Sequence, residues 1–170
     1  MKTNLTSVVR RQSFGQFAFF ISLFLAAFAS TALAQFSVSY TATQFQLFGL
    51  AHFERNPLCP DGYMIDQIGF GPANYCTIVV TVPTTGTYNI DFQGETEYPR
   101  GLFLALGSES GPQSSLSGTI STGTSFKIPV EYSIGTMTLY AGQNTLVFFN
   151  AQTTGKFDRC PYISQVTVSQ

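Results

Sequence analysis

The stretch Val80-Thr-Val-Pro-Thr-Thr-Gly-Thr-Tyr-Asn-Ile-Asp-Phe92 places a Pro/Gly turn between two runs of alternating apolar and polar residues. Two later stretches repeat the arrangement: Leu139-Tyr-Ala-Gly-Gln-Asn-Thr-Leu-Val-Phe-Phe149 has a Gly-Gln-Asn turn, and Ile163-Ser-Gln-Val-Thr-Val168 closes the chain. Alternation with a period of two residues indicates half-buried strands, and Gly and Pro mark the turns between them. Together the three stretches predict an all-β protein built as an antiparallel β-sandwich.

Similar patterns recur along the rest of the chain, and no segment has a convincing helical period. The stretch 45–53 suits either a strand or a short helix, and 56–62 is predicted to be a loop because it holds two prolines and an Asp-Gly pair. Strands are predicted around 36–40, 64–70, 76–82, 88–92, 102–106, 136–140, 146–149 and 163–168, with a short one at 116–120 inside the loop 107–123. About eight to ten strands suffice for two packed sheets.

The N-terminal segment has the pattern of a secretory signal peptide. Lys2, Arg10 and Arg11 precede the apolar run 17–28, and Ala32-Leu-Ala34 supplies the small residues of a cleavage site. A membrane anchor is the competing interpretation, but spanning a bilayer takes about 20 apolar residues and the run is shorter. We therefore expect residues 1–34 to be removed. Residues 35–170 would then form a single domain that is secreted, extracellular and not held at a membrane.

The charge of the predicted mature part bears on its partners. All nine acidic residues lie after residue 34, against only five basic ones, which gives a formal net charge of −4. Phosphate binding needs a basic surface, so nucleic acid is not an expected partner. Few charges and many Thr, Ser, Gln, Gly and Phe residues suit an extracellular β protein.

Three cysteines in an oxidising compartment allow one disulfide and one spare thiol. Cys76 lies in register with the apolar side of its strand and is predicted to be a buried free thiol. Cys59 and Cys160 are each followed by proline, which places both in loops. The predicted disulfide is therefore Cys59–Cys160, with a pairing through Cys76 as the alternative.

Three segments of the chain carry short recognisable motifs. They are 68–75, Ile-Gly-Phe-Gly-Pro-Ala-Asn-Tyr; 122–126, Thr-Gly-Thr-Ser-Phe; and 157–168, which includes the last predicted strand. The first resembles the glycine-rich approach to a Gly-Asp-Tyr/Trp strand start, the second is similar to Thr-Gly-Gly-Trp, and the third resembles a closing segment with a ligand-binding Asn. All three motifs are those of carbohydrate-binding modules of families 6 and 35, which have a galactose-binding-like jelly-roll fold. The resemblance extends over 64–168 and implies the same jelly roll.

The resemblance also implies where a ligand would bind. In these modules the loops at the three places converge on one end of the sandwich and hold a sugar between aromatic rings. Such rings suit sugars because a pyranose presents a patch of C–H groups that lies flat on a π surface. The family's Asn position falls near Tyr162 or Ser164 here. The expected ligand-binding residues are Phe70, Asn74, Tyr75, Phe126 and Tyr162.

A structural calcium ion is a further feature that the resemblance implies. In these modules an early strand carries a Glu-Ala-Glu-like motif, and the matching segment here is 40–45, Tyr-Thr-Ala-Thr-Gln-Phe, which lacks both acids. Calcium prefers several oxygen ligands, carboxylates among them. We therefore expect no cofactor, with a structural calcium left as an open alternative.

Catalytic and metal-binding motifs are not evident in the sequence. His52 is the single histidine and has no nucleophile motif beside it, so we expect it to be a solvated or a capping residue. Glu95 and Glu97 would share one face of a strand, and paired carboxylates can cleave glycosides. No zinc spacing, phosphate loop or nucleophile elbow is present. We expect a protein that is not an enzyme.

These observations favour a secreted, non-catalytic, lectin-like protein whose partner is a polysaccharide or other glycan. A second hypothesis is an extracellular structural or adhesive protein that has kept the fold and lost the sugar site. A third is a small glycan hydrolase that uses Glu95 or Glu97. The first two differ in whether Tyr75, Phe126 and Tyr162 are exposed or buried. The sequence leaves the glycan and the oligomeric state open.

Overall fold

A computed structural model describes residues 35–69, 71, 73–120, 125–150 and 159–170. Gln35–Gln170 forms one compact unit. No helix among the described residues is long and apolar enough to cross a membrane. The predicted signal peptide lies outside the described residues.

Strands and one short 3-10 helix, η1 (Ala42–Gln44), make up the regular structure of the described residues. The strands are β1 (Ser37–Thr41), β2 (Gln46–Leu47), β3 (His52–Arg55), β4 (Tyr63–Asp66), β5 (Cys76–Val82), β6 (Gly86–Thr96), β7 (Arg100–Leu106), β8 (Gly118–Ile120), β9 (Ser125–Leu139), β10 (Gly142–Phe149) and β11 (Tyr162–Ser169).

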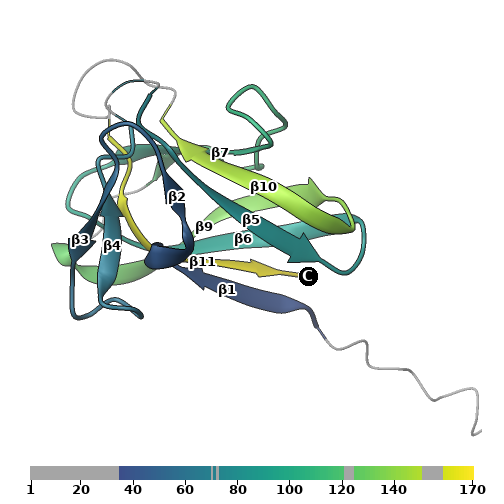
Figure 1. Cartoon of the computed structure of the whole chain (residues 1–170), viewed down its shortest axis with the longest axis horizontal. Coiled ribbons are helices and arrows are strands. Elements are labelled where there is room, and N and C mark those ends of the chain that lie inside the picture. Colours follow the sequence, from purple (N-terminus) through teal and green to yellow (C-terminus); the bar gives the residue numbers. More distant parts are fainter. Residues whose placement is uncertain (1–34, 70, 72, 121–124, 151–158) are drawn as a thin grey trace, which may run out of the picture. The chain divides into compact units, whose positions relative to one another are not determined.

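The strands form two antiparallel sheets that face each other (Figure 1). The six-stranded sheet has the order β3-β4-β11-β6-β9, and β1 pairs with β11 outside this path. The five-stranded sheet has the order β2-β5-β10-β7-β8. The prediction of an all-β antiparallel sandwich is confirmed.

The hydrophobic core lies between the sheets and follows the predicted alternation. Along β5, the side chains of Cys76, Ile78, Val80 and Val82 are buried, while those of Val79 and Thr81 are exposed. On β6 the buried apolar positions are Tyr88, Ile90 and Phe92, and on β7 they include Leu102 and Leu104. The period-two pattern thus identified the inward face of these strands correctly.

Three segments differ from the expectation. The ambiguous stretch 45–53 contains β2 and the start of β3, and η1 lies just before it. β4 ends at Asp66, although a strand was predicted over 64–70. β9 begins at Ser125, although a strand was predicted only from Thr136. The first half of β9 is mostly exposed, with Ile128 and Val130 among its exposed residues. Because this half buries little apolar surface, its sequence lacks the alternation that marks a half-buried strand.

The predicted disulfide is wrong, because all three cysteines are free, buried thiols. Cys160 belongs to the same core cluster as Cys76. Cys59 instead donates a hydrogen bond from Sγ to Oε1 of Glu95, at 3.2 Å. Burial and the neighbouring Glu95 raise the pKa of the Cys59 thiol to about 12. The expectation that Cys76 is a buried free thiol is confirmed.

Glu95 is a buried carboxyl group near the end of β6. Its side chain is 0% exposed, and Oε2 has no hydrogen-bond partner in the part of the chain that the structure describes. Burial raises the pKa of Glu95 to about 7, although the Cys59 hydrogen bond opposes the shift. Glu97 lies beyond the end of β6 and is exposed. The two acids therefore do not form a carboxylate pair on one face.

The raised pKa of Glu95 predicts a stability that depends on pH. The folded state holds this proton more tightly than the unfolded state, whose pKa is close to the ordinary 4.5. The contribution of protonated Glu95 to the stability of the folded state is fully present below about pH 4.5 and is lost as the pH rises to about 7. Relative to Glu95→Gln, the free energy of unfolding of the wild type should fall by up to about 3 kcal/mol between pH 4.5 and 8. Urea unfolding at several pH values measures this change in the free energy of unfolding.

The control for this measurement is Glu97→Gln, which removes an exposed carboxylate two residues away and should keep the wild-type pH dependence. Parallel pH curves for the wild type and Glu95→Gln would contradict the prediction.

The turn between β9 and β10 yields a second stability prediction. Asn144 is buried; its Oδ1 accepts a hydrogen bond from Tyr140 N (2.9 Å), and its Nδ2 donates to the carbonyl oxygens of Tyr140 (2.7 Å) and Gly142 (3.1 Å). Asn144→Ala should lower the free energy of unfolding by about 1–3 kcal/mol, because part-buried backbone groups of the turn lose their hydrogen-bond partners. Denaturant unfolding measures the loss. Gln143→Ala, at the exposed neighbouring residue, is the control. Equal losses of unfolding free energy in Asn144→Ala and Gln143→Ala would contradict the prediction.

Candidate functional site

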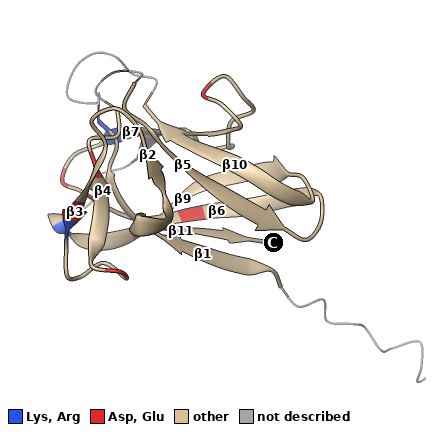
Figure 2. Cartoon of the chain, viewed as in Figure 1, with Lys and Arg blue, Asp and Glu red and all other residues tan. Residues whose placement is uncertain are grey.

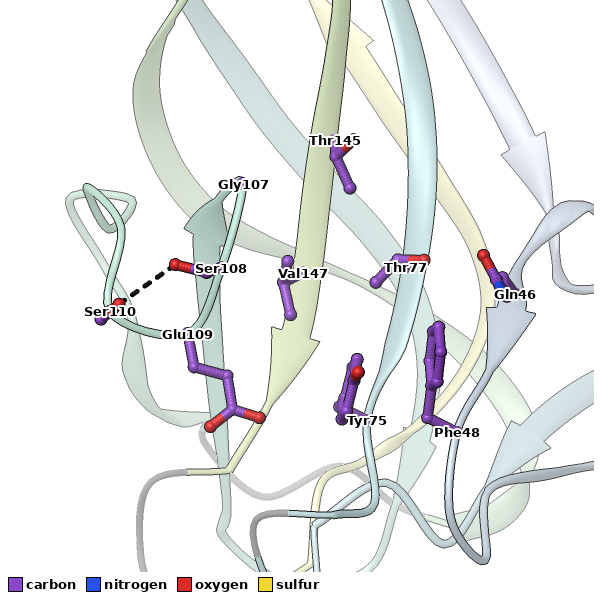
Figure 3. Close-up of a pocket in the computed structure, with 10 residues that line it drawn as sticks. All are labelled: Gln46, Phe48, Tyr75, Thr77, Gly107, Ser108, Glu109, Ser110, Thr145 and Val147. Atoms are coloured by element: carbon purple, nitrogen blue, oxygen red, sulfur yellow. Dashed lines mark hydrogen bonds between the residues drawn. The ribbon is translucent and has the colours of Figure 1, made fainter.

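Two hollows contain the predicted aromatic residues. The first, here called the Tyr75 groove, has a volume of about 650 Å³ (Figure 3). The residues that line it are Gln46, Phe48, Tyr75, Thr77, Gly107, Ser108, Glu109, Ser110, Thr145 and Val147.

The floor of the Tyr75 groove is the outer face of the five-stranded sheet. Thr77 on β5 pairs with Val147 on β10, and Thr145 lies two residues before Val147 on the same face. The intervening Leu146 points the other way, into the core. Val147 also joins a small apolar cluster on the outer face, against which Tyr75 packs. The floor therefore combines hydroxyl groups with a buried apolar base.

One wall of the groove is a pair of stacked aromatic rings. The ring centroids of Phe48 and Tyr75 are 4.4 Å apart, and the ring planes differ by 11°. Figure 3 shows Phe48 on one side of the Tyr75 ring, with Val147 and Glu109 on the other. Phe48 N also donates a hydrogen bond to Tyr75 O, at 3.0 Å. The Tyr75 face that Phe48 leaves uncovered thus borders the groove.

Asn74 supports the Phe48–Tyr75 wall through a hydrogen bond to the backbone of the adjacent loop. It is buried, and its Oδ1 accepts a hydrogen bond from Leu50 N at 2.8 Å. Gly49 has a φ of +66°, and a Cβ atom there would collide with the Asn74 side chain and the Ala73 carbonyl group. The glycine lets the chain pass close to Asn74 and brings Phe48 onto Tyr75. A direct contact of Asn74 with a ligand stays a prediction.

The opposite wall is the loop after β7. Gly107 N donates to Thr145 O (2.8 Å), and Gly111 N donates to Ser108 O (2.8 Å), which fixes the loop beside β10. The loop brings Glu109 and two serine hydroxyl groups to the groove. Among the described residues that line the groove, Glu109 alone carries a charge. Figure 2 shows that β5 and β10 are uncharged and that charged residues gather near β3 and β4.

The second hollow, here called the Phe126 pocket, has a volume of about 440 Å³. The Phe126 and Tyr162 rings lie 5.6 Å apart, and Tyr98 contacts Phe126 edge-on at 5.9 Å. The residues that line the pocket are Glu54, Arg55, Asn56, Pro57, Leu58, Met64, Phe126, Lys127 and Tyr162.

Arg100 supports the two aromatic rings of this pocket. Its guanidinium carbon lies 4.8 Å from the centroid of Phe126 and 5.7 Å from that of Tyr162. It donates from Nη1 to Cys160 O at 3.0 Å and is only 9% exposed. Burial lowers the pKa of Arg100 and raises that of Tyr162. The cation–π contacts with Arg100 hold the Phe126 and Tyr162 rings in place.

The predicted aromatic residues thus divide between two hollows. Tyr75 lines the groove, whereas Phe126 and Tyr162 line the pocket, and neither hollow contains all three. All three side chains are half-buried. Phe70 lies outside the described residues.

Several residues of the Tyr75 groove were missed in the sequence. Phe48 lies in the stretch whose secondary structure was ambiguous, and Glu109 lies in a loop that was classed by composition. A single acid in a Ser/Gly loop after a predicted strand is the signal that could have drawn attention to Glu109. Thr145 faces outward by the same alternation that places Leu146 in the core.

Comparison with known proteins supports the family resemblance. No protein-family model matches the chain, and no curated protein matches it. Among solved structures, a family 35 carbohydrate-binding module from Clostridium thermocellum has 25% sequence identity and a TM-score of 0.68, covering 78% of this chain and 98% of that one. The family 35 module from Paenibacillus barcinonensis has 21% identity, a TM-score of 0.63 and the same two coverages.

Enzymes also contain a domain of this shape. The exo-β-1,3-galactanase of Phanerochaete chrysosporium matches 78% of this chain with a TM-score of 0.65 and 15% identity, but the match covers 29% of the enzyme. The matches to separate modules extend over almost the whole of those modules. The resemblance seen in the sequence is confirmed, and the chain has the β-sandwich fold of family 35 carbohydrate-binding modules.

Proposed function

We propose that this chain is a secreted, non-catalytic, lectin-like protein that binds a glycan in the Tyr75 groove. The observation that carries the proposal is the Tyr75 ring, which has one face against Phe48 and the other toward a groove of hydroxyl, amide and carboxylate groups. A sugar ring stacked on Tyr75 would bring its hydroxyl groups within reach of Thr77, Thr145 and Glu109. The fold of carbohydrate-binding modules supports the same function.

The groove supports binding rather than glycoside cleavage. Glycosidases of the common type place two carboxyl groups on either side of the scissile bond. Glu109 is the single carboxylate among the described lining residues, and Glu95 is buried elsewhere. Secretion rests on the signal-peptide pattern of residues 1–34. The proposal requires no cofactor.

The Tyr75 groove also suits one class of glycan better than another. Its single charge is the half-buried carboxylate of Glu109. A uronate or sulfate group placed in the groove would meet a like charge at close range, whereas a neutral hexose would accept or donate hydrogen bonds there. Neutral polysaccharides are therefore the proposed partners.

Replacing Tyr75 should abolish most glycan binding. In Tyr75→Ala the stacking surface is lost, so affinity for the glycans selected on an array should fall at least about tenfold, or about 1.4 kcal/mol. Isothermal titration calorimetry or affinity electrophoresis measures the affinity. Tyr140→Ala is the matched control, because Tyr140 is an exposed tyrosine at the β9–β10 turn. Phe126→Ala should leave the affinity unchanged.

If Phe126→Ala loses binding and Tyr75→Ala keeps it, the site is the Phe126 pocket and the assignment to the groove is wrong. If the wild type binds no plant, fungal, algal or bacterial glycan, the structural or adhesive alternative takes its place.

Neutralising Glu109 should change selectivity. In Glu109→Gln the affinity for uronic-acid polysaccharides should rise about fivefold relative to that for neutral ones, because a repulsion of about 1 kcal/mol is removed. The ratio of the two affinities is measured at low and high salt, since salt screens the effect in the wild type. Glu131→Gln, which removes an exposed carboxylate on β9, should leave the ratio unchanged. An unchanged ratio in Glu109→Gln would contradict the proposed selectivity.

A further inference from the structure

Three side chains that can bind a metal meet on the β3–β4 hairpin, outside the Tyr75 groove. One ligand atom from each of His52, Glu54 and Asp66 lies within 4.8 Å of the others. The backbone explains this arrangement: His52 on β3 is paired directly with Asp66 on β4, and Glu54 follows His52 by two residues on the same face. Two adjacent strands therefore hold the three ligands at neighbouring positions.

The histidine ring is oriented in the way that metal-binding histidines usually are. Nδ1 of His52 lies 3.1 Å from the carbonyl oxygen of Leu50. In the tautomer that donates Nδ1–H to this oxygen, Nε2 keeps its lone pair. Ligating histidines commonly donate their second ring N–H to a carbonyl or carboxylate group, which fixes the ring. The Leu50 carbonyl group supplies that partner here.

Asp66 provides a second, independent observation. Its side chain is only 9% exposed. One carboxylate oxygen, Oδ1, accepts a hydrogen bond from Gln67 N. Oδ2 accepts none from the described residues and is not among their fully buried atoms that lack a partner. This oxygen is therefore open to an external ion on the side of the hairpin where His52 and Glu54 lie.

Arg100, the arginine on which the Asp66 charge acts, already has other partners. The Asp66 charge acts on Arg100, but the Arg100 guanidinium group donates to Cys160 O and stacks on the Phe126 and Tyr162 rings. Asp66 and Glu54 both contribute to the raised pKa of Tyr162, which places both carboxylates near that ring. The hairpin therefore presents two carboxylates and an imidazole side by side.

We propose that His52, Glu54 and Asp66 bind a divalent transition-metal ion, with zinc(II) as the best match. An imidazole nitrogen combined with carboxylate oxygens suits zinc, whereas calcium and magnesium prefer oxygen ligands alone. Three protein ligands leave one position of a tetrahedral site for water or an external ligand. The ion would join the edge strand β3 to β4, beside the Phe126 pocket that Glu54 also lines. This proposal does not depend on glycan binding.

The single histidine makes a direct test possible. We would record the ring ¹H–¹⁵N NMR signals of untagged protein while adding zinc chloride, because His52 is the only histidine in the chain. The expected result is a change at Nε2 that saturates at one equivalent, is reversed by EDTA and is not produced by magnesium. Ring signals that stay unchanged in a tenfold excess of zinc would overturn the proposal.

Variants separate a three-ligand site from zinc binding by the imidazole alone. Glu54→Gln and Asp66→Asn should each weaken zinc binding more than about tenfold, the factor by which even outer-shell partners change metal affinity. Glu131→Gln is the control, and it should bind zinc as the wild type does. Because Glu54 is exposed, Glu54→Gln carries the test even if Asp66→Asn does not fold. Full affinity in Glu54→Gln would show that no such site exists.

Discussion

The packing of the β5–β10 pair against the six-stranded sheet is the interaction on which the rest of the structure depends. Ile78, Val80, Leu146 and Phe148 point inward from these two strands and form much of the core. The residues between them necessarily point outward, and they form the floor of the Tyr75 groove. A register shift of one residue would exchange the two faces, so the apolar core also determines which hydroxyl groups line the groove.

Buried polar side chains then place the loops on this framework. Asn74 binds the backbone of the loop that carries Phe48, and Asn144 binds the turn between β9 and β10. In both places an amide side chain satisfies backbone groups that have no partner in a sheet, which makes these positions costly to change. The stacked wall of Phe48 and Tyr75 therefore depends on Asn74. This residue was expected to contact a ligand, and it binds the backbone of the loop that carries Phe48.

Charge is distributed unevenly over the fold, and the two proposed sites follow this division. The strands under the groove carry no charge, and one carboxylate lies at its border (Figure 2). Near β3 and β4, carboxylates, arginines and the histidine lie close together, and the arginine that is stacked on two aromatic rings is largely withdrawn from solvent. Stacking of a neutral sugar suits the first environment, and a divalent cation suits the second.

The sequence by itself determined the fold class, most of the strands and the inward face of each, because the period-two alternation along β5, β6 and β7 is local and follows directly from burial. It also indicated the family resemblance, and the role of Tyr75 in ligand binding stays a prediction. It did not reveal the first half of β9, whose exposed residues have no such alternation. Only the tertiary structure decided that Tyr75 is separated from Phe126 and Tyr162, that Cys59 meets Glu95 instead of Cys160, and that His52 lies opposite Asp66. Each of these depends on which strands pair and in which register, and pairing between residues distant in sequence leaves no local periodicity to detect.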